Sequence, residues 1–237
     1  MISDFGNLYL IPTTLGSSAP LEVLPLSVKK AVDHIDEYIV ENEKTARRFI
    51  GSIGSNVDQN KLKFHILNKY TTPEELPTFL EGLKSGKDVG LLSEAGCPGI
   101  ADPGADVVAM AHEKGIRVVP MIGPSSILLS LMASGLNGQS FAFQGYLPID
   151  KKDRKHKIKE LERVSRMHNQ TQLFIETPYR NMALLNDLLQ HCSPGTRLCI
   201  ATDISLPSEY IDTKTIADWN RSFPDIHKRP TIFLILS

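Results

Sequence analysis

The sequence predicts an α/β protein built from two domains. Short apolar runs alternate with segments of helical periodicity from the N-terminus onward, which indicates sheets covered by helices. A chain of 237 residues is long enough for two domains of about 100 to 150 residues each. Two prolines and a glycine fall between Pro120 and Pro124, so we place the boundary near Met121. We therefore expect a mostly parallel sheet in residues 1–121 and a mixed sheet in residues 122–237.

Local signals mark each element of the first domain. Strands are expected at residues 8–11, 38–40, 64–67, 89–92 and 115–120, where apolar runs are bounded by Gly, Pro or polar residues. Helices are expected between them, at residues 26–35, from residue 42 onward, at 76–83 and from 107. Pro25 permits a helix start near Leu26, and Gly86 marks a helix end.

The second domain continues the alternation. Ser125 or Ser126 can cap a helix over residues 127–134, which Gly135 terminates. Further helices are expected over the basic residues 151–166 and over residues 179–191, with strands at 141–146, 171–175 and 197–201. The β-rich residues 231–236 are expected to complete the second sheet.

Composition narrows the class of protein. A hydrophobic fraction of 41% and a charged fraction of 22% are ordinary for a globular protein and exclude disordered and fibrous classes. No apolar run approaches the roughly 18 residues of a membrane span, and the first residues lack a secretory signal, so we expect a cytoplasmic protein without membrane contact. Cys97, Cys192 and Cys199 are too few for a disulfide framework and lack zinc-ligand spacing, so we expect reduced thiols and no metal.

Positive charge is concentrated in residues 151–166. Eight Lys or Arg stand there against three acidic residues, a local charge of +5 in a chain of net charge −1. Such a run is usually a solvated helix face, and the sequence pI of about 6.7 is low for a dedicated RNA-binding protein. The alternative is that the run contacts the phosphates of RNA.

The central loop, residues 93–104, is the first candidate for a binding site. It lies between the strand 89–92 and the next helix, and it holds three Gly and two Pro in twelve residues. Loops at the carboxyl ends of strands are where open α/β sheets bind ligands, although a tight turn without a ligand would have a similar composition. Neither GxxxxGK[ST] nor GxGxxG after the first strand is present, which disfavours nucleoside triphosphates and ordinary dinucleotides.

Five motifs in order resemble those of the tetrapyrrole (corrin/porphyrin) methylase family. Within it, the chain is most similar to the bacterial enzymes that methylate a ribose 2′-hydroxyl of 16S ribosomal RNA. The motifs are residues 8–16, the central loop, residues 119–126, residues 143–148 and residues 176–180. The resemblance implies an S-adenosylmethionine-dependent methyltransferase of two α/β domains with the cofactor in the cleft between them, usually a homodimer, acting on ribosomal RNA or the small ribosomal subunit.

Carried over by motif, the resemblance implies cofactor contacts on four segments. These are Thr13 and Thr14, then Ala95, Gly96, Cys97, Ile100 and Ala101, then Ser125 and Ser126, and finally Glu176 and Thr177. Lys44, Arg47 and Arg48 match basic positions of the ribosomal RNA enzymes. The chain departs from their pattern at Thr14, Asn42 and Thr202–Asp203. The residues expected to bind the cofactor therefore match the family pattern better than those expected to bind the methyl acceptor.

Methyl transfer to oxygen requires in-line alignment and gains from a base near the hydroxyl. Candidate catalytic carboxylates are Glu41, Glu94 and Asp102, with Glu43 a further one, and each has the alternative of being a solvated or capping group. Two other functions remain open at this point. One is methylation of a tetrapyrrole or another small molecule, and the other is RNA binding by a catalytically silent homologue.

Overall fold

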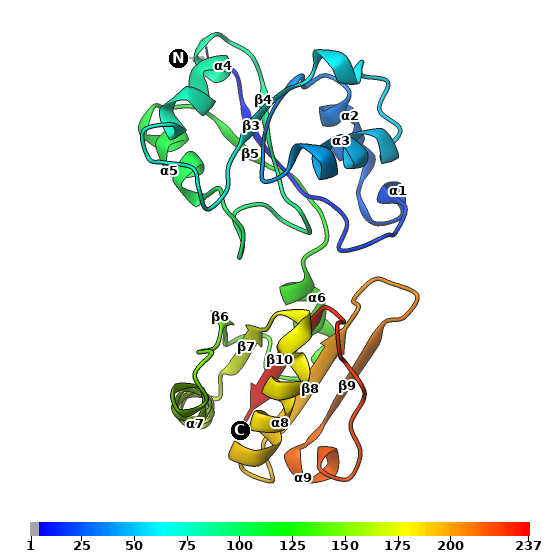
Figure 1. Ribbon diagram of the computed structural model, residues 1–237, viewed down its shortest axis with the longest axis vertical. Coiled ribbons are helices and arrows are strands. Elements are labelled where there is room, and N and C mark those ends of the chain that lie inside the picture. Colours follow the sequence, from blue (N-terminus) through cyan, green and yellow to red (C-terminus); the bar gives the residue numbers. More distant parts are fainter. Residues whose placement is uncertain (1–4) are drawn as a thin grey trace. The chain divides into compact units, whose positions relative to one another are not determined.

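The computed structural model describes residues 5–237, which divide into two compact α/β units (Figure 1). The first unit extends to Ser125 and the second comprises Ser126–Ser237. The α/β fold class predicted from the sequence is confirmed. Within the described residues, none of the helices is long and apolar enough to cross a membrane.

The first unit contains a five-stranded sheet in the order β3-β2-β4-β1-β5. Every neighbouring pair of strands is parallel. Ile11 of β1 and Val40 of β2 both pair with Leu92 of β4, so the three central strands end level with one another. The elements are β1 (Leu8–Ile11), α1 (Pro20–Val23), α2 (Leu26–Val32), β2 (Glu37–Val40), α3 (Glu43–Ser52), η1 (Gln59–Lys61), β3 (Lys63–Ile66), η2 (Leu76–Leu80), α4 (Glu81–Lys84), β4 (Val89–Leu92), α5 (Ala105–Glu113) and β5 (Val118–Pro120).

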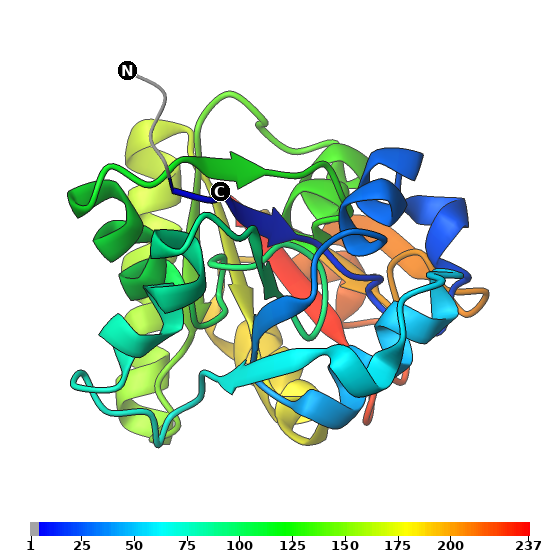
Figure 2. The same cartoon turned by 90° about the horizontal axis from the view of Figure 1, so that it is seen from above.

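Helices cover both faces of this sheet. One apolar cluster joins α2 and α3 to the sheet through Val28, Phe49 and Ile11, and a second joins α4 and α5 to the opposite face through Leu83 and Val107. Figure 2 shows the blue α1 and α2 on one side of β1 and the teal and green α4 and α5 on the other. The chain therefore leaves β1 toward one face and leaves the adjacent β4 toward the other, which makes the carboxyl ends of these strands a topological switch point.

Gly123, after β5, packs directly against the segment after β1. A Cβ atom on Gly123 would lie 2.3 Å from Pro12 Cγ and 2.4 Å from Pro12 Cβ, closer than any real contact. The loops after β1 and β5 can approach one another this closely because residue 123 has no side chain.

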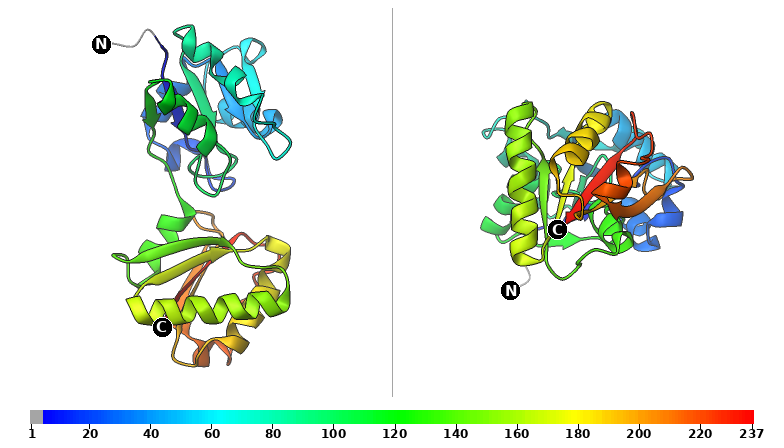
Figure 3. Two further views of the ribbon diagram at one scale, coloured as in Figure 1. Left: turned by 90° about the vertical axis from the view of Figure 1, so that its left-hand side faces the viewer. Right: turned by 90° about the horizontal axis from the view of Figure 1, so that it is seen from below.

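The second unit holds a mixed sheet in the order β6-β7-β10-β8-β9. β6 and β7 are parallel, whereas β10 is antiparallel to both β7 and β8, and β9 to β8. Side chains of α7, α8 and α9 form one core with the sheet, and the long α7 crosses that face in Figure 3. The elements are α6 (Ser126–Ser134), β6 (Phe141–Tyr146), α7 (Lys151–His168), β7 (Thr171–Ile175), η3 (Pro178–Arg180), α8 (Asn181–His191), β8 (Arg197–Thr202), β9 (Tyr210–Thr215), α9 (Ile216–Trp219) and β10 (Thr231–Leu236).

Several elements differ from the sequence-based expectation, and the short helices α1, η1 and α9 were not predicted. β9 was not predicted, because an edge strand paired on one side only can be polar, as its residues Asp212, Thr213 and Lys214 are. The helix expected over residues 76–83 is a 3₁₀ helix, η2, followed by the single turn α4. Pro77 lies in the first turn of η2, where a helix tolerates proline because the N–H groups there have no intrahelical partner.

Replacing Gly123 by Ala should destabilise the first unit. The new methyl group would overlap Pro12, and overpacking of this kind costs about 1–3 kcal/mol. Gly138→Ala is the matched control, because a Cβ there meets no atom within 4 Å. Urea denaturation followed by circular dichroism should give a lower midpoint for Gly123→Ala alone, and equal midpoints for the two variants would refute the close packing.

Candidate functional site

The first turn and the central loop meet at the switch point between β1 and β4. The Thr13 amide donates a hydrogen bond of 2.9 Å to the Gly96 carbonyl, which joins the two loops directly. Ser93 is buried, and its hydroxyl accepts from the Ala95 amide and donates to the Ala95 carbonyl, both at 3.1 Å. The central loop therefore turns sharply as it leaves β4 and lies against the first turn.

The central loop holds several residues at positive φ, of which Gly96 and Ala101 bear most directly on the site. Gly96 has φ +76°, and a Cβ atom there would lie 3.1 Å from both Leu15 Cδ2 and the Pro124 carbonyl oxygen. Ala101 has φ +57°, a left-handed conformation that is costly for a residue with a side chain. Strained backbone that persists in a folded protein is concentrated at ligand and active sites, so it supports a binding role for this loop.

Three carboxyl groups lie together at the carboxyl ends of β2 and β4. Glu41 follows β2, and Glu94 and Asp102 belong to the central loop. Burial raises the pKa of Glu41 to about 8, with smaller contributions from a hydrogen bond with Asp102 and from the charges of Asp102 and Glu94. Glu41 therefore keeps a proton at neutral pH and can donate it to Asp102. The structure thus brings together the three carboxylates that the sequence singled out as candidate catalytic groups.

α3 contributes to this site through its first turn. Its N-cap is Asn42, whose side chain accepts from the Lys44 and Thr45 amides. The Thr45 hydroxyl donates to Glu94 Oε1 at 2.5 Å, which positions the Glu94 carboxylate beside the helix. Glu43, the further candidate base, instead pairs with Arg47 on the helix surface at 2.8 Å.

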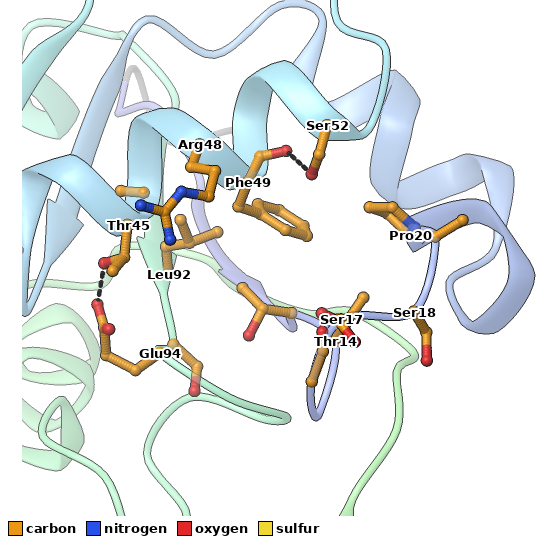
Figure 4. A pocket seen from close by; sticks show the side chains of 15 residues that line it. Thr14, Ser17, Ser18, Pro20, Thr45, Arg48, Phe49, Ser52, Leu92 and Glu94 are labelled. Atoms are coloured by element: carbon orange, nitrogen blue, oxygen red, sulfur yellow. Dashed lines mark hydrogen bonds between the residues drawn. The ribbon is translucent and has the colours of Figure 1, made fainter. Parts of the chain in front are cut away.

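A cavity of about 540 Å³ opens between the first turn, α3 and the central loop. We call it the hydroxyl cavity; its lining comprises residues 13–14 and 16–20, Thr45, Ala46, Arg48, Phe49 and Ser52 of α3, and residues 92–94. Figure 4 shows that Thr14, Ser17, Ser18, Thr45 and Ser52 bring hydroxyl groups to it, together with the Glu94 carboxylate. The Thr13 hydroxyl oxygen is buried and has no hydrogen-bond partner among the described residues.

A second cavity, of about 550 Å³, lies beside the other part of the central loop. Its lining is largely apolar and comprises Leu10, residues 97–100, Ala105, Val108, Ala109, His112, Pro120 and Met121. Burial raises the pKa of the Cys97 thiol, whose sulfur lies 3.5 Å from the Pro124 carbonyl oxygen. Cys97 therefore stays a neutral thiol that packs against the backbone.

The expected cofactor residues are divided among these places. Thr13 and Thr14 line the hydroxyl cavity, Cys97 and Ile100 line the apolar cavity, and Ala95, Gly96 and Ala101 belong to the loop that borders both. Ser125 ends the first unit. Ser126, Glu176 and Thr177 belong to the second unit.

Glu176, directly after β7, has an incompletely bonded carboxylate. Its Oε1 accepts hydrogen bonds of 2.6 Å from the Thr177 amide and from Arg180 Nη2. Its Oε2 is buried without a hydrogen-bond partner in the described part of the chain. A buried carboxylate oxygen in this state calls for a donor from water or a ligand.

Among the residues of the site that sequence reasoning missed are Thr45, Phe49 and Ser52 of α3. Together with Arg48 they lie three or four residues apart, so they share one face of α3, the face that lines the hydroxyl cavity. That spacing, directly after a strand end, was a usable signal. No group of three or more His, Cys, Asp or Glu within residues 5–237 is arranged to hold a metal ion.

Comparisons with known proteins agree with this architecture. The family model for Tetrapyrrole (Corrin/Porphyrin) Methylases matches residues 29–219. A Vibrio cholerae protein named Ribosomal RNA small subunit methyltransferase I is 30% identical over 211 residues, which cover 89% of this chain and 69% of the relative. Its namesake from Bacillus subtilis is 34% identical over 178 residues, or 75% of this chain and 57% of the relative.

A solved structure shares the fold across the whole chain. The uroporphyrin-III C-methyl transferase of Thermus thermophilus, complexed with S-adenyl homocysteine, matches with a TM-score of 0.56 at 15% identity and covers 98% of both chains. At this identity, the likeness establishes the fold.

Replacing Glu41 by Gln should change how stability depends on pH. Between the ordinary pKa of 4.5 and about 8, folded Glu41 holds a proton that the unfolded chain has lost, so the free energy of unfolding falls as the pH rises. Gln cannot ionise and removes this fall. The urea midpoint of Glu41→Gln, measured relative to that of the wild type, should therefore be higher at about pH 8.5 than at about pH 5. The surface variant Glu43→Gln is the control, and a Glu41→Gln variant with the wild-type pH dependence would contradict the raised pKa.

Proposed function

Because this chain belongs to the tetrapyrrole (corrin/porphyrin) methylase family and is an S-adenosylmethionine-dependent methyltransferase, we propose that it methylates a ribose 2′-hydroxyl of small-subunit ribosomal RNA. The observation that carries the proposal is the carboxyl cluster of Glu41, Glu94 and Asp102 beside the hydroxyl cavity. The curated relatives named above are longer than this chain, and the acceptor in their name supports the choice of RNA.

The residues present fit the cofactor. The buried Thr13 hydroxyl, without a partner in the described chain, can bond a polar group of the cofactor, and the apolar cavity at Cys97 and Ile100 can take an apolar part of it. We propose that the central loop, with Thr13, Thr14, Ser125, Ser126, Glu176 and Thr177, holds it. When bound, the sulfonium supplies a methyl group for in-line displacement by the acceptor oxygen.

The carboxyl cluster supplies a place for the acceptor's proton. In the Glu41–Asp102 pair, one group keeps a proton while the other accepts, so the accepting oxygen can take the proton of a nearby hydroxyl. Because the raised pKa of Glu41 leaves its proton in place at neutral pH, Asp102 is the accepting group of the pair, and Glu41 orients it through the hydrogen bond between them. Thr45 orients Glu94 beside the pair.

The basic residues of α7 support RNA as the partner. We define the basic stripe as Lys152, Lys155, Lys159, Arg163 and Arg166, which are exposed, recur at helical spacing and form no ion pairs with other described residues. Arg154, in contrast, is buried and pairs with Asp187 at 2.5 Å, so it stabilises the unit. Lys152 lies in the first turn of α7, where a cation opposes the helix dipole by about 0.3–1 kcal/mol. Because Lys152 does not stabilise the helix, contact with phosphates explains the basic stripe better than helix stability does.

Transfer of label from S-adenosylmethionine to small ribosomal subunits tests the proposal. Undermethylated subunits incubated with the enzyme and methyl-labelled cofactor should acquire label on a ribose 2′-oxygen of their RNA. The double variant Lys155→Ala, Lys159→Ala should bind the subunits more weakly and with a smaller salt dependence, because fewer counterions are released.

Lys84→Ala removes an exposed lysine of the first unit and serves as the control for loss of charge. Label found on a base or on protein, or no transfer of label at all, would overturn ribose methylation. If label reaches ribose and the double variant binds the subunits as tightly as the wild type, the basic stripe does not contact the RNA.

A further inference from the structure

The hydroxyl cavity carries a charge pattern that the proposed function does not explain by itself. Arg48 is its only cationic lining residue among those described, and Glu94 its only anionic one. Arg48 is exposed and forms no ion pair in the described chain. Its neighbour Arg47 is engaged instead, through the ion pair with Glu43, a hydrogen bond to the Gln59 carbonyl and the Phe64 ring 4.6 Å away. Two adjacent arginines of α3 therefore have different roles.

Several hydroxyl groups of the cavity have already used their protons. The Thr14 hydroxyl donates to the Gly16 carbonyl at 2.6 Å, and the Ser52 hydroxyl donates to the Phe49 carbonyl at 2.8 Å. What these oxygens offer a ligand is lone pairs, as does the Glu94 carboxylate. The cavity thus presents several acceptors and one cation, together with the Thr13 hydroxyl, which has no partner in the described chain.

This pattern matches a ligand with many donors and one negative charge. A nucleotide within RNA has a 2′-hydroxyl and base N–H donors and carries one charge at its phosphate. A tetrapyrrole that bears several carboxylates would meet one cation, a row of acceptors and the Glu94 charge, so the cavity disfavours it. A volume of about 540 Å³ lies in the range of small-molecule sites, and Phe49 supplies an aromatic surface.

We propose that the hydroxyl cavity is the subsite for the acceptor nucleotide, with Arg48 holding its phosphate and Glu94 on the side of its sugar. The proposal deepens the proposed function and rests on it for the identity of the acceptor. Arg48 is a substrate-binding residue in this account, and its planar guanidinium can donate two parallel hydrogen bonds to phosphate. Thr13, which bonds the central loop, lines the same cavity.

Binding of small nucleotides tests the subsite without any methyl transfer. Saturation-transfer NMR with the four nucleoside 5′-monophosphates and the matching nucleosides, in the presence of S-adenosylhomocysteine, measures the gain from the phosphate. The wild type should bind at least one monophosphate about tenfold more tightly than its nucleoside, and Arg48→Gln should lose that gain. Arg48→Lys should recover part of it, because a point charge replaces the two-pronged contact.

Arg117→Gln is the matched control, since Arg117 is an exposed arginine of the same unit outside the cavity. It should keep the full preference for the monophosphate. Equal binding of monophosphate and nucleoside by the wild type, or an unchanged preference in Arg48→Gln, would overturn the subsite. Monophosphate binding that depends on Arg48 in an enzyme that leaves ribosomal RNA unlabelled would support the subsite and refute the proposed acceptor.

Discussion

The close approach of three loops at one end of the first sheet is the constraint on which the site depends. The Thr13 amide bonds the Gly96 carbonyl, and Gly123 packs against Pro12 with no room for a side chain. These contacts hold the ends of β1, β4 and β5 together, at the switch point where the chain leaves for opposite faces of the sheet. A cavity on each side of the central loop is the consequence.

Charge is distributed on this frame in a way that suits proton transfer to and from a neutral acceptor. Glu41 is buried next to Asp102 and retains its proton at neutral pH, whereas Glu94 is held outward by Thr45. Arg48 lines the hydroxyl cavity together with Glu94, and the basic stripe lies along α7 of the second unit. In the proposed ribose methylation, the carboxyl groups would serve the reacting hydroxyl and the cations would serve the phosphates.

Much of the fold could be predicted from the sequence because its signals are local. Buried strands such as Val89–Leu92 are continuous apolar runs, and Gly or Pro marks most helix ends. β9 escaped prediction because an edge strand needs no apolar run. Glu41, Glu94 and Asp102 could be named from their positions after strands, but their hydrogen bonding and the raised pKa of Glu41 depend on how distant segments meet. The role of Arg48 could not be predicted either, because the sequence does not distinguish it from its neighbour Arg47, which forms an ion pair with Glu43.

Calorimetric titration with S-adenosylmethionine tests most directly whether the loops after β1, β4 and β5 form the cofactor site. The account predicts that the wild type binds and that Gly96→Ala binds about tenfold more weakly, because a side chain at φ +76° costs about 1–2 kcal/mol and presses on Leu15 and the Pro124 carbonyl. Gly138→Ala, remote from these loops in sequence, should bind as the wild type does. No heat of binding at millimolar cofactor, or equal affinities for all three proteins, would contradict it.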